Sequence, residues 1–202
     1  LRRFLEAADT PAAARHRAWT GCVPAERLAA LAEPGGPLAL PPEPATPAAR
    51  TTIDALLALD LTGYLPDDLL VKLDRASMAA SLEGRAPFLD HHLVEFATRL
   101  PMALKVRGLA TKRVLRRAVA DLVPAPILGR TKRGLTVPLA AWLAGPLLPF
   151  ARATLERLDA RVFRPEAVRA LLDEHVARRR DNRRELWALV MLQLWRERWV
   201  AA

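Results

Sequence analysis

Cysteine is nearly absent from this sequence: among 202 residues, Cys22 is the single thiol. One cysteine excludes an intrachain disulfide, and it excludes a metal cluster held by several thiolates of this chain. We therefore expect Cys22 to behave as a small apolar residue that is buried in the core.

Long apolar runs are also missing. No stretch reaches the length of about 20 residues that a membrane-spanning helix needs, and the first residues, LRRFLE, lack the uninterrupted apolar core of a secretory signal. Hydrophobic residues nevertheless make up 51% of the chain, which is enough for a folded domain with a sizeable core. A cytoplasmic protein is the resulting expectation.

Acidic residues are outnumbered by basic ones, and the formal net charge is +9. Such an excess can neutralise phosphates, so a basic helical nucleic-acid-binding module is one hypothesis for function. The sequence is also rich in Ala, Leu, Arg and Pro, whose codons are GC-rich, and this gives the arginine excess an explanation without a nucleic-acid partner.

Convincing strand patterns are absent too, and the predicted fold class is predominantly α-helical. Residues 1–50 read as a helical segment with a proline-rich linker, and residues 51–202 as a second part. The linker, residues 34–47, cannot form a regular hydrogen-bonded ladder, so we expect a mobile surface loop there. Helices are expected over residues 12–19, 25–31, 51–61, 92–100, 112–122, 138–143, 147–158, 165–179 and 184–200.

The last two helices carry the clearest core signals. Residues 165–179 place Val168, Leu171, Leu172, His175 and Val176 on one face. Residues 184–200 carry tryptophans at helical spacing, and we expect these side chains to pack in the core. They are Trp187, Trp195 and Trp199.

The most informative stretch is SLEGRAPFLDHH at residues 81–92, which crowds two acids, a base and a glycine into one short apolar segment. Glu83 and Arg85 are two residues apart in an extended segment, so their side chains point to the same side and are predicted to pair. Asp90 is placed to cap the next helix. His91 and His92 are adjacent and have no third ligand nearby, so no metal site is predicted.

A helix start is predicted just upstream, in YLPDDLLVKLDR. Pro66 would occupy an early helical position, and Asp67 and Asp68 would lie in the first turn, where the helix dipole favours negative charge.

Three ordered motifs resemble those of one family. They are YLPDDLLVKLDRASMAASLEGRAPFLDHHLVEFA, TKRVLRRA and RTKRGLTVPLAAWL. Together they are similar to the C-terminal part of the synthetase domain in the asparagine synthetase family, whose members hydrolyse glutamine and use ATP to form amides. Three motifs in order are more specific than any one alone. The strong part covers about residues 53–133 and continues more weakly to the C-terminus.

The resemblance implies a reaction and a fold. ATP would activate a carboxylate, often aspartate, as an acyl-adenylate, and ammonia from glutamine would attack it, with ATP and Mg²⁺ as cofactors. The chain would be the C-terminal helical half of an α/β domain of the adenine-nucleotide α-hydrolase-like, PP-loop ATP pyrophosphatase kind. Relatives of this fold form β-lactams or close peptide macrolactam rings, so the carboxylate substrate stays open.

The resemblance also singles out Lys112, the lysine of the family motif K-x-x-L-R-x-A, as a contact to the phosphates of the activated substrate. A preorganised cation there stabilises the charge that develops as pyrophosphate leaves. Thr111 is predicted to cap a helix beginning at Lys112, whose N–H groups would add positive potential toward an anion. From spacing alone, a solvated surface lysine is the alternative.

Glu83 is the second catalytic candidate. In the β-lactam-forming synthetases an acid from this region works with an upstream tyrosine as a base dyad, so by analogy Glu83 is a catalytic acid/base. A purely structural ion pair with Arg85 is the alternative. The candidate substrate- or nucleotide-binding residues are Arg85, Arg75, Lys132 and Asp90.

Three family features do not occur in the sequence: the first-residue cysteine of the glutaminase domain, the Ser-Gly-Gly pyrophosphate-binding loop, and a glycine-rich segment with paired acids. We therefore expect part of a longer enzyme, inactive alone, whose partners are the N-terminal synthetase half and the glutaminase domain. That half would hold most of the ATP and Mg²⁺. Without it, the helices should expose a large apolar patch. A catalytically inactive scaffold for partner chains is a third hypothesis.

Overall fold

The computed structural model describes residues 10–38, 47–131, 134 and 137–200. The described backbone is mostly helical and contains no β-strand; its extended pairing is limited to two isolated bridges, Ala32 with Phe163 and Arg107 with Ala110. The prediction of a predominantly α-helical chain is therefore confirmed. Most of the proline-rich connector, residues 39–46, lies outside the described residues.

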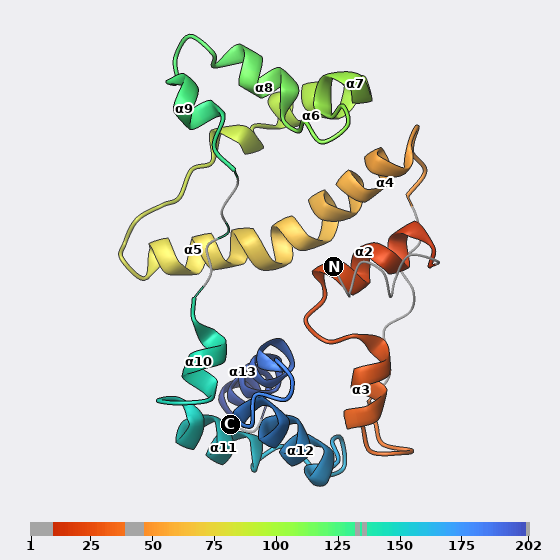
Figure 1. Cartoon of the computed structure of the whole chain (residues 1–202), viewed down its shortest axis with the longest axis vertical. Coiled ribbons are helices and arrows are strands. Elements are labelled where there is room, and N and C mark those ends of the chain that lie inside the picture. The colour runs from red at the N-terminus through yellow and green to blue at the C-terminus, as the bar shows by residue number, and fades with distance from the viewer. Residues whose placement is uncertain (1–9, 39–46, 132–133, 135–136, 201–202) are drawn as a thin grey trace. The chain divides into compact units, whose positions relative to one another are not determined.

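The chain divides into two compact units, Leu1–Pro44 with Leu135–Ala202 (unit 1) and Ala45–Gly134 (unit 2). The proposed division of the family domain at residue 50 stays a prediction. Figure 1 shows the helices. Unit 1 contains α2 (Ala12–Thr20), α3 (Ala25–Leu31), α10 (Leu139–Leu143), α11 (Leu148–Leu155), α12 (Pro165–Val176) and α13 (Arg183–Trp199). Unit 2 contains α4 (Thr52–Leu59), the π-helix η1 (Asp60–Leu70), α5 (Val71–Met78), the 3-10 turn η2 (Pro87–Leu89), α6 (His91–Arg99), α7 (Met102–Lys105), α8 (Arg113–Ala118) and α9 (Ala125–Leu128).

Unit 1 has a hydrophobic core where α11, α12 and α13 meet. Leu143, Leu186 and Val190 are completely buried. The predicted inner face of α12 is confirmed, because its buried residues are Val168, Leu171, Leu172 and His175, with Val176 packed at the edge of the core.

The tryptophans of α13 correct one prediction. The helix buries Leu186, Leu189, Val190 and Gln193, whereas the side chains at four-residue spacing on another face are exposed. Those are Trp187 (37% exposed), Met191 (46%), Trp195 (54%) and Trp199 (68%). The register of the helix is right, but α13 has two apolar faces, and the aliphatic one forms the core. Cys22 is likewise exposed rather than buried.

Asn182 closes the loop between α12 and α13. Its side chain is fully buried, and the amide nitrogen donates to the Leu171 carbonyl (2.9 Å) and to a Glu174 carboxylate oxygen (3.0 Å). The amide oxygen accepts from Arg27 of α3 at 3.1 Å. The Asn182 backbone N–H donates to Nδ1 of His175 at 3.2 Å, so Nε2 of the neutral ring donates to the Ala140 carbonyl. Asn182 thus links α3, α12 and α13.

Replacing Asn182 by alanine is expected to lower the free energy of unfolding of unit 1 by about 2–4 kcal/mol, because the buried Leu171 carbonyl and two partly buried charged groups, Arg27 and Glu174, lose their partner together. All five tryptophans belong to unit 1 and the one tyrosine, Tyr64, to unit 2, so tryptophan fluorescence in a urea titration reports the change. Asp181→Ala, which changes the neighbouring exposed side chain, is the control. Equal midpoints for the two variants would show that the network does not stabilise unit 1.

In unit 2, one continuous helical stretch runs through α4, η1 and α5. The predicted helix start at Pro66 is therefore wrong: Pro66 lies inside the π-helical segment, and Asp67 and Asp68 do not occupy a first turn. The physical reason is that proline lacks an N–H and its ring clashes with the carbonyl four residues earlier, which a wider helical turn relieves without ending the helix.

Unit 2 has almost no core of its own. Among its described residues, Ala55 alone is buried. Large apolar side chains are exposed throughout the unit; they include Met78 (54%), Leu82 (64%), Phe88 (65%), Phe96 (57%) and Leu122 (79%). Exposed apolar side chains are thus present in the unit that carries Glu83 and Lys112; that they form one large patch stays a prediction.

Candidate active site

Glu83 and Arg85 follow α5 in an extended segment, and their side chains form the predicted ion pair. The distance from Arg85 to the Glu83 carboxylate is 3.2 Å, and the side chains are 83% and 69% exposed. The pairing prediction is confirmed. Because both groups are solvated, the pair adds little to stability, and the carboxylate is accessible to a ligand.

The backbone around Glu83 explains how the segment reaches this place. Ser81 has a φ of 59° and ends α5 in a Schellman motif, with hydrogen bonds from Leu82 N to Ser77 O and from Ser81 N to Met78 O. The chain then turns back along α5. A Cβ added to Gly84 would lie 3.4 Å from Cγ of Leu73 and 3.5 Å from Oγ of Ser77, so the segment lies directly on α5, at ordinary contact distance.

Asp90 caps α6, as predicted. Its carboxylate oxygen Oδ1 accepts hydrogen bonds from the backbone N–H groups of His92 (3.0 Å) and Leu93 (3.3 Å). These bonds satisfy donors that the first turn of a helix leaves free. The further role of Asp90 in substrate or nucleotide binding stays a prediction.

Lys112 requires a correction of its local structure. The helix begins at Arg113 and not at Lys112, ends at Ala118, and Thr111 does not cap it. Lys112 occupies the residue before the helix with φ 55° and ψ 34°. A six-residue helix is too short to contribute a substantial field, so a role for Lys112 must come from its own ammonium group.

The left-handed backbone of Lys112 is itself informative. Three described non-glycine residues have positive φ: Ser81, Lys112 and Arg178. Ser81 and Arg178 both end a helix in a Schellman motif, where this conformation is usual. Lys112 instead precedes a helix, where no such motif explains a conformation that costs an L-residue about 1 kcal/mol. An unexplained strained residue supports a hypothesis of function at that position.

The Lys112 side chain is exposed and makes no hydrogen bond or ion pair within the described residues. Arg75, on α5, is exposed as well. No hydrogen bond or ion pair within the described ranges joins Lys112 to Glu83, so each is a separate candidate in unit 2. Lys132 lies outside the described residues.

Motif reasoning missed one charged pair in unit 2. Lys105 and Asp54 are 3.0 Å apart, and each side chain is only 14% exposed. Lys105 falls inside the motif-rich block, but its partner lies 51 residues away, which no local pattern reveals.

The described part of the chain contains no group of three or more His, Cys, Asp or Glu side chains that could hold a metal ion. None of its helices is both long and apolar enough to cross a membrane.

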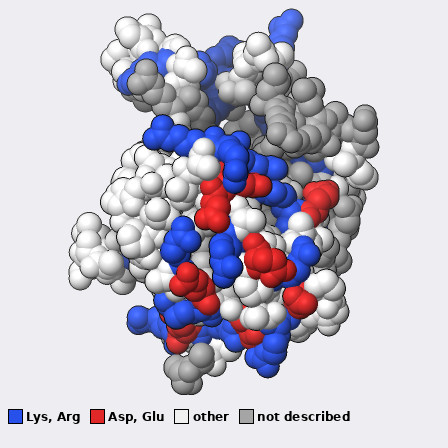
Figure 2. Space-filling view, turned by 60° about the horizontal axis from the view of Figure 1, so that its bottom comes forward, with Lys and Arg blue, Asp and Glu red and all other residues white. Residues whose placement is uncertain are grey.

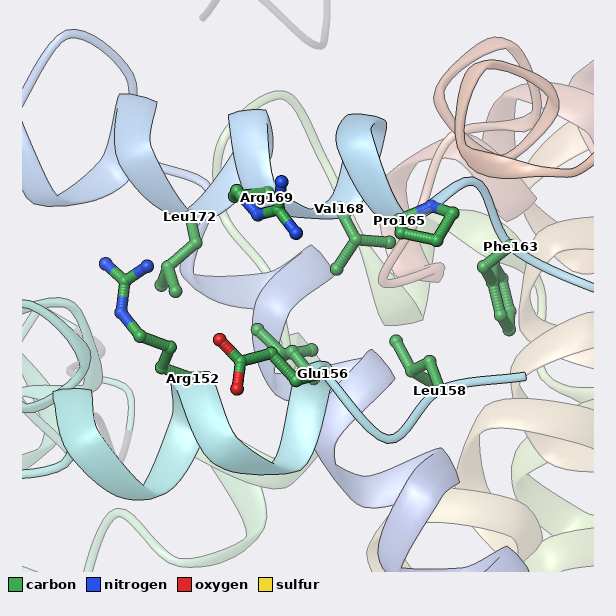
Figure 3. A pocket seen from close by; sticks show the side chains of 9 residues that line it. Arg152, Glu156, Leu158, Phe163, Pro165, Val168, Arg169 and Leu172 are labelled. Atoms are coloured by element: carbon green, nitrogen blue, oxygen red, sulfur yellow. The ribbon is translucent and has the colours of Figure 1, made fainter. Parts of the chain in front are cut away.

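A pocket of about 230 Å³ lies in unit 1 between α11 and α12 (Figure 3). Its floor is apolar, and Arg152, Glu156 and Arg169 bring charge to it. Arg152 also pairs with Asp173 at 3.6 Å. The pocket contains none of the residues that the motifs single out.

The arginine excess does not form a continuous basic stripe on the face shown in Figure 2, where acidic and basic side chains are interspersed. Several arginines of unit 1 are held by acids: Arg157 by Glu197 (2.7 Å), and both Arg161 and Arg196 by Asp159 (2.8 Å each). The two arginines hold the pKa of the Asp159 carboxyl well below its usual value. These side chains are less available to phosphates than the net charge suggests.

Comparison with known proteins decides the family. The sequence model of the asparagine synthase family matches residues 1–197. The chain belongs to the asparagine synthase family. It is 43% identical over 139 residues to a putative glutamine-hydrolysing asparagine synthetase of Mycobacterium tuberculosis, covering 68% of this chain and 21% of that protein. It is 33% identical over 145 residues to asparagine synthetase 1 of Bacillus subtilis, covering 71% of this chain and 23% of that protein.

The chain is also similar to the protein named amidase chry2 of Gibberella zeae. The two are 36% identical over 80 residues, which cover 37% of this chain and 12% of that protein. No solved structure matches the chain. The chain spans about a fifth of the length of the two synthetases above.

Proposed function

We propose that this chain is the C-terminal part of the synthetase domain of an ATP-dependent, asparagine synthetase-like amidotransferase. In the complete enzyme, ATP activates a carboxylate, with aspartate as the first candidate, as an acyl-adenylate, and ammonia from glutamine forms the amide. The observation that carries this proposal is the family match over residues 1–197. The short share of its relatives that the chain covers supports an enzyme completed by other segments.

Lys112 is proposed as the cation beside the departing pyrophosphate. Its ammonium group is exposed and has no assigned protein partner in the described ranges, and its backbone is held in a strained conformation that no capping motif explains. A fixed, unneutralised cation stabilises the charge that develops on phosphate oxygens more than it stabilises the ground state.

Glu83 is proposed as the acid/base that handles the protons of the attacking amine. Its exposure leaves one face of the carboxylate for a substrate while Arg85 holds the other. Arg85, Arg75 and Lys132 would contribute positive charge toward the nucleotide or acidic substrate, and Asp90 would fix the start of α6 near it.

ATP and Mg²⁺ are proposed to be held mainly by another part of the enzyme. The described residues offer no cluster that fits a metal ion, and the sequence contains no Ser-Gly-Gly loop. The proposed fold of the complete domain is the PP-loop ATP pyrophosphatase kind, an α/β sheet covered by helices such as those of unit 2.

The exposed apolar surface of unit 2 supports this assembly. Side chains such as Leu82, Phe88 and Phe96 are more than half exposed, and where such large apolar side chains gather on a surface, another chain or domain normally covers them. The N-terminal synthetase half is the proposed cover, with the glutaminase domain as the source of ammonia.

The test uses the complete protein encoded by the uninterrupted reading frame that contains these 202 residues. We expect release of pyrophosphate from ATP that requires aspartate, together with formation of asparagine when glutamine or ammonium is added. Pyrophosphate release that ignores aspartate but responds to another carboxylate would redirect the proposal to a β-lactam- or macrolactam-forming enzyme. A complete protein that releases none with any carboxylate would support the inactive scaffold.

A further inference from the structure

Lys105 is a shielded cation in unit 2, where the described lysines and arginines other than Lys105 and Arg113 are exposed. Its side chain is 14% exposed, and Nζ donates to Oδ1 of Asp54 (3.0 Å) and to the backbone carbonyl of Thr98 (3.0 Å). Two of its three donors are therefore occupied by unit 2 itself. This use of the ammonium group makes Lys105 a poor candidate for binding phosphate directly.

Asp54 is the anion at the centre of a small cluster. Thr51 donates to its other oxygen, Oδ2, at 3.1 Å, and Arg50 lies 3.8 Å from the same atom. The hydrogen bond from Lys105 lowers the pKa of the Asp54 carboxyl below its usual value. Asp54 therefore stays ionised and balances two cations at once.

The same two cations cap the C-terminus of α6. Arg50 donates to the carbonyls of Thr98 (3.1 Å), Arg99 (3.4 Å) and Leu100 (3.4 Å), while Lys105 also donates to the Thr98 carbonyl. Cations are favoured at the carbonyl end of a helix. Asp54 on α4 thereby ties α6 and α7 to the long helical stretch of the unit.

The segment that follows Lys105 leads directly to Lys112. It is a tight loop in which Arg107 and Ala110 exchange backbone hydrogen bonds of 3.0 and 3.1 Å, with Gly108 at φ 58°. After Lys112, the Arg113 side chain donates to the Ala103 carbonyl of α7. Both sides of Lys112 are thus fixed to α7, and α7, a single turn of four residues, is itself fixed through Lys105.

We propose that Asp54, acting through Lys105, is a positioning residue for Lys112. This inference rests on the proposed function for the identity of the anion that Lys112 meets, but the mechanical link is a property of unit 2. One helical turn is too short to hold its own orientation, so the Asp54–Lys105 contact sets the direction in which the 106–112 loop presents the amine. Neither residue touches the substrate.

The first measurement is amide hydrogen exchange in the complete protein, which does not depend on catalysis. Asp54→Asn keeps the shape of the side chain and removes its charge. We expect amides of residues 106–116 to exchange at least about tenfold faster, since the partly buried ammonium of Lys105 loses its anion, while α5 changes less than about twofold. Lys105→Met should reproduce this result, and Lys105→Arg, which keeps the charge and donors, should largely restore protection.

The control is Asp68→Asn, because Asp68 and Lys72 form an exposed pair in the same unit, 3.5 Å apart. It should leave the 106–116 amides unchanged. Unchanged exchange in both Asp54→Asn and Lys105→Met would overturn the proposal. A uniform rise over all of unit 2 would overturn it as well, because the pair would then hold up the whole unit and not the loop.

The second measurement is a double-mutant cycle on pyrophosphate release. Asp54→Asn alone should lower kcat/KM by about ten- to a hundredfold, whereas the same change in a Lys112→Met background should have almost no further effect, since the group being positioned is already gone. If the losses of kcat/KM from Asp54→Asn and Lys112→Met multiply in the double variant, the link between Asp54 and Lys112 is overturned. A complete enzyme that is unaffected by Lys112→Met would instead contradict the proposed role of that lysine, while the exchange data would still decide whether Asp54 holds the loop.

Discussion

Replacing Lys112 by methionine is expected to reduce kcat/KM for aspartate-dependent pyrophosphate release by about 10²- to 10³-fold in the complete enzyme. Methionine keeps the length of the side chain and removes the charge. Loss of a single preorganised group that stabilises developing negative charge has an effect of this size. The ammonium group has no assigned partner in the described ranges and its residue is exposed, so folding should be unaffected, and the loss would reflect the chemistry alone.

Arg117→Met is the matched control for this experiment. Arg117 is exposed on α8, five residues from Lys112, and occupies a variable position of the motif K-x-x-L-R-x-A. The Arg117→Met substitution removes one positive charge near Lys112 without removing the proposed contact between Lys112 and the phosphates. We expect kcat/KM of this variant to stay within about threefold of the original enzyme, because salt largely screens an exposed charge that does not contact the phosphates. Equal losses in the two variants would mean that Lys112 acts only through the general positive field.

The positions of several helices were predictable from the sequence because residues close to a helix end determine where the helix begins or stops. Thr51 caps α4 by accepting a hydrogen bond from the Asp54 N–H, and Asp90 caps α6 in the same way. The helix after Pro24 starts at Ala25 as expected, and the helix expected from Pro138 starts one residue later, at Leu139. Side chains within three residues of these ends decide them, so no tertiary information is needed.

Burial was harder to predict, and α13 shows why. Spacing identifies the faces of a helix, but it does not say which of two apolar faces meets the rest of the protein. Leu186 and Val190 are completely buried, while Trp195 and Trp199, on another face, are more than half exposed. Hydrophobicity alone favours the tryptophans, yet the decision depends on neighbours contributed by α11 and α12, which are remote in sequence.

The candidate residues come from the motifs and their roles stay predictions, whereas their geometry was not predictable from the sequence. Family motifs select Lys112 and Glu83, and two-residue spacing predicts the pairing of Glu83 with Arg85. The left-handed conformation of Lys112 and the contact between Lys105 and Asp54 depend on how α4, α7 and α8 meet. A sequence carries no local signal for a contact between residues 51 positions apart.

Replacing Glu83 by glutamine is the second change with a large expected effect, and it separates the two interpretations of this residue. If Glu83 moves a proton in the reaction, kcat/KM for amide formation should fall by about 10²- to 10⁴-fold, the usual contribution of general acid–base catalysis. The melting temperature should shift by less than about 2 °C, because both members of the Glu83–Arg85 pair are exposed. Partial reactions can locate the step at which Glu83 acts. An acid/base for the amine is needed only after the adenylate has formed. The Glu83→Gln variant should therefore still catalyse the carboxylate-dependent exchange of labelled pyrophosphate into ATP.

Glu95→Gln supplies the matched control, since Glu95 and Arg99 form a comparable exposed pair in unit 2 at 3.4 Å, with side chains 59% and 80% exposed. Losing a solvated ion pair should leave amide formation within about twofold of the original enzyme. A structural role for Glu83 makes a different prediction: Arg85→Gln would then reduce activity as much as Glu83→Gln, and combining the two would add nothing. If Glu83 acts on the substrate, the double variant should instead lose more activity than either single variant, because Arg85 is proposed to contribute its own charge toward the nucleotide or acidic substrate.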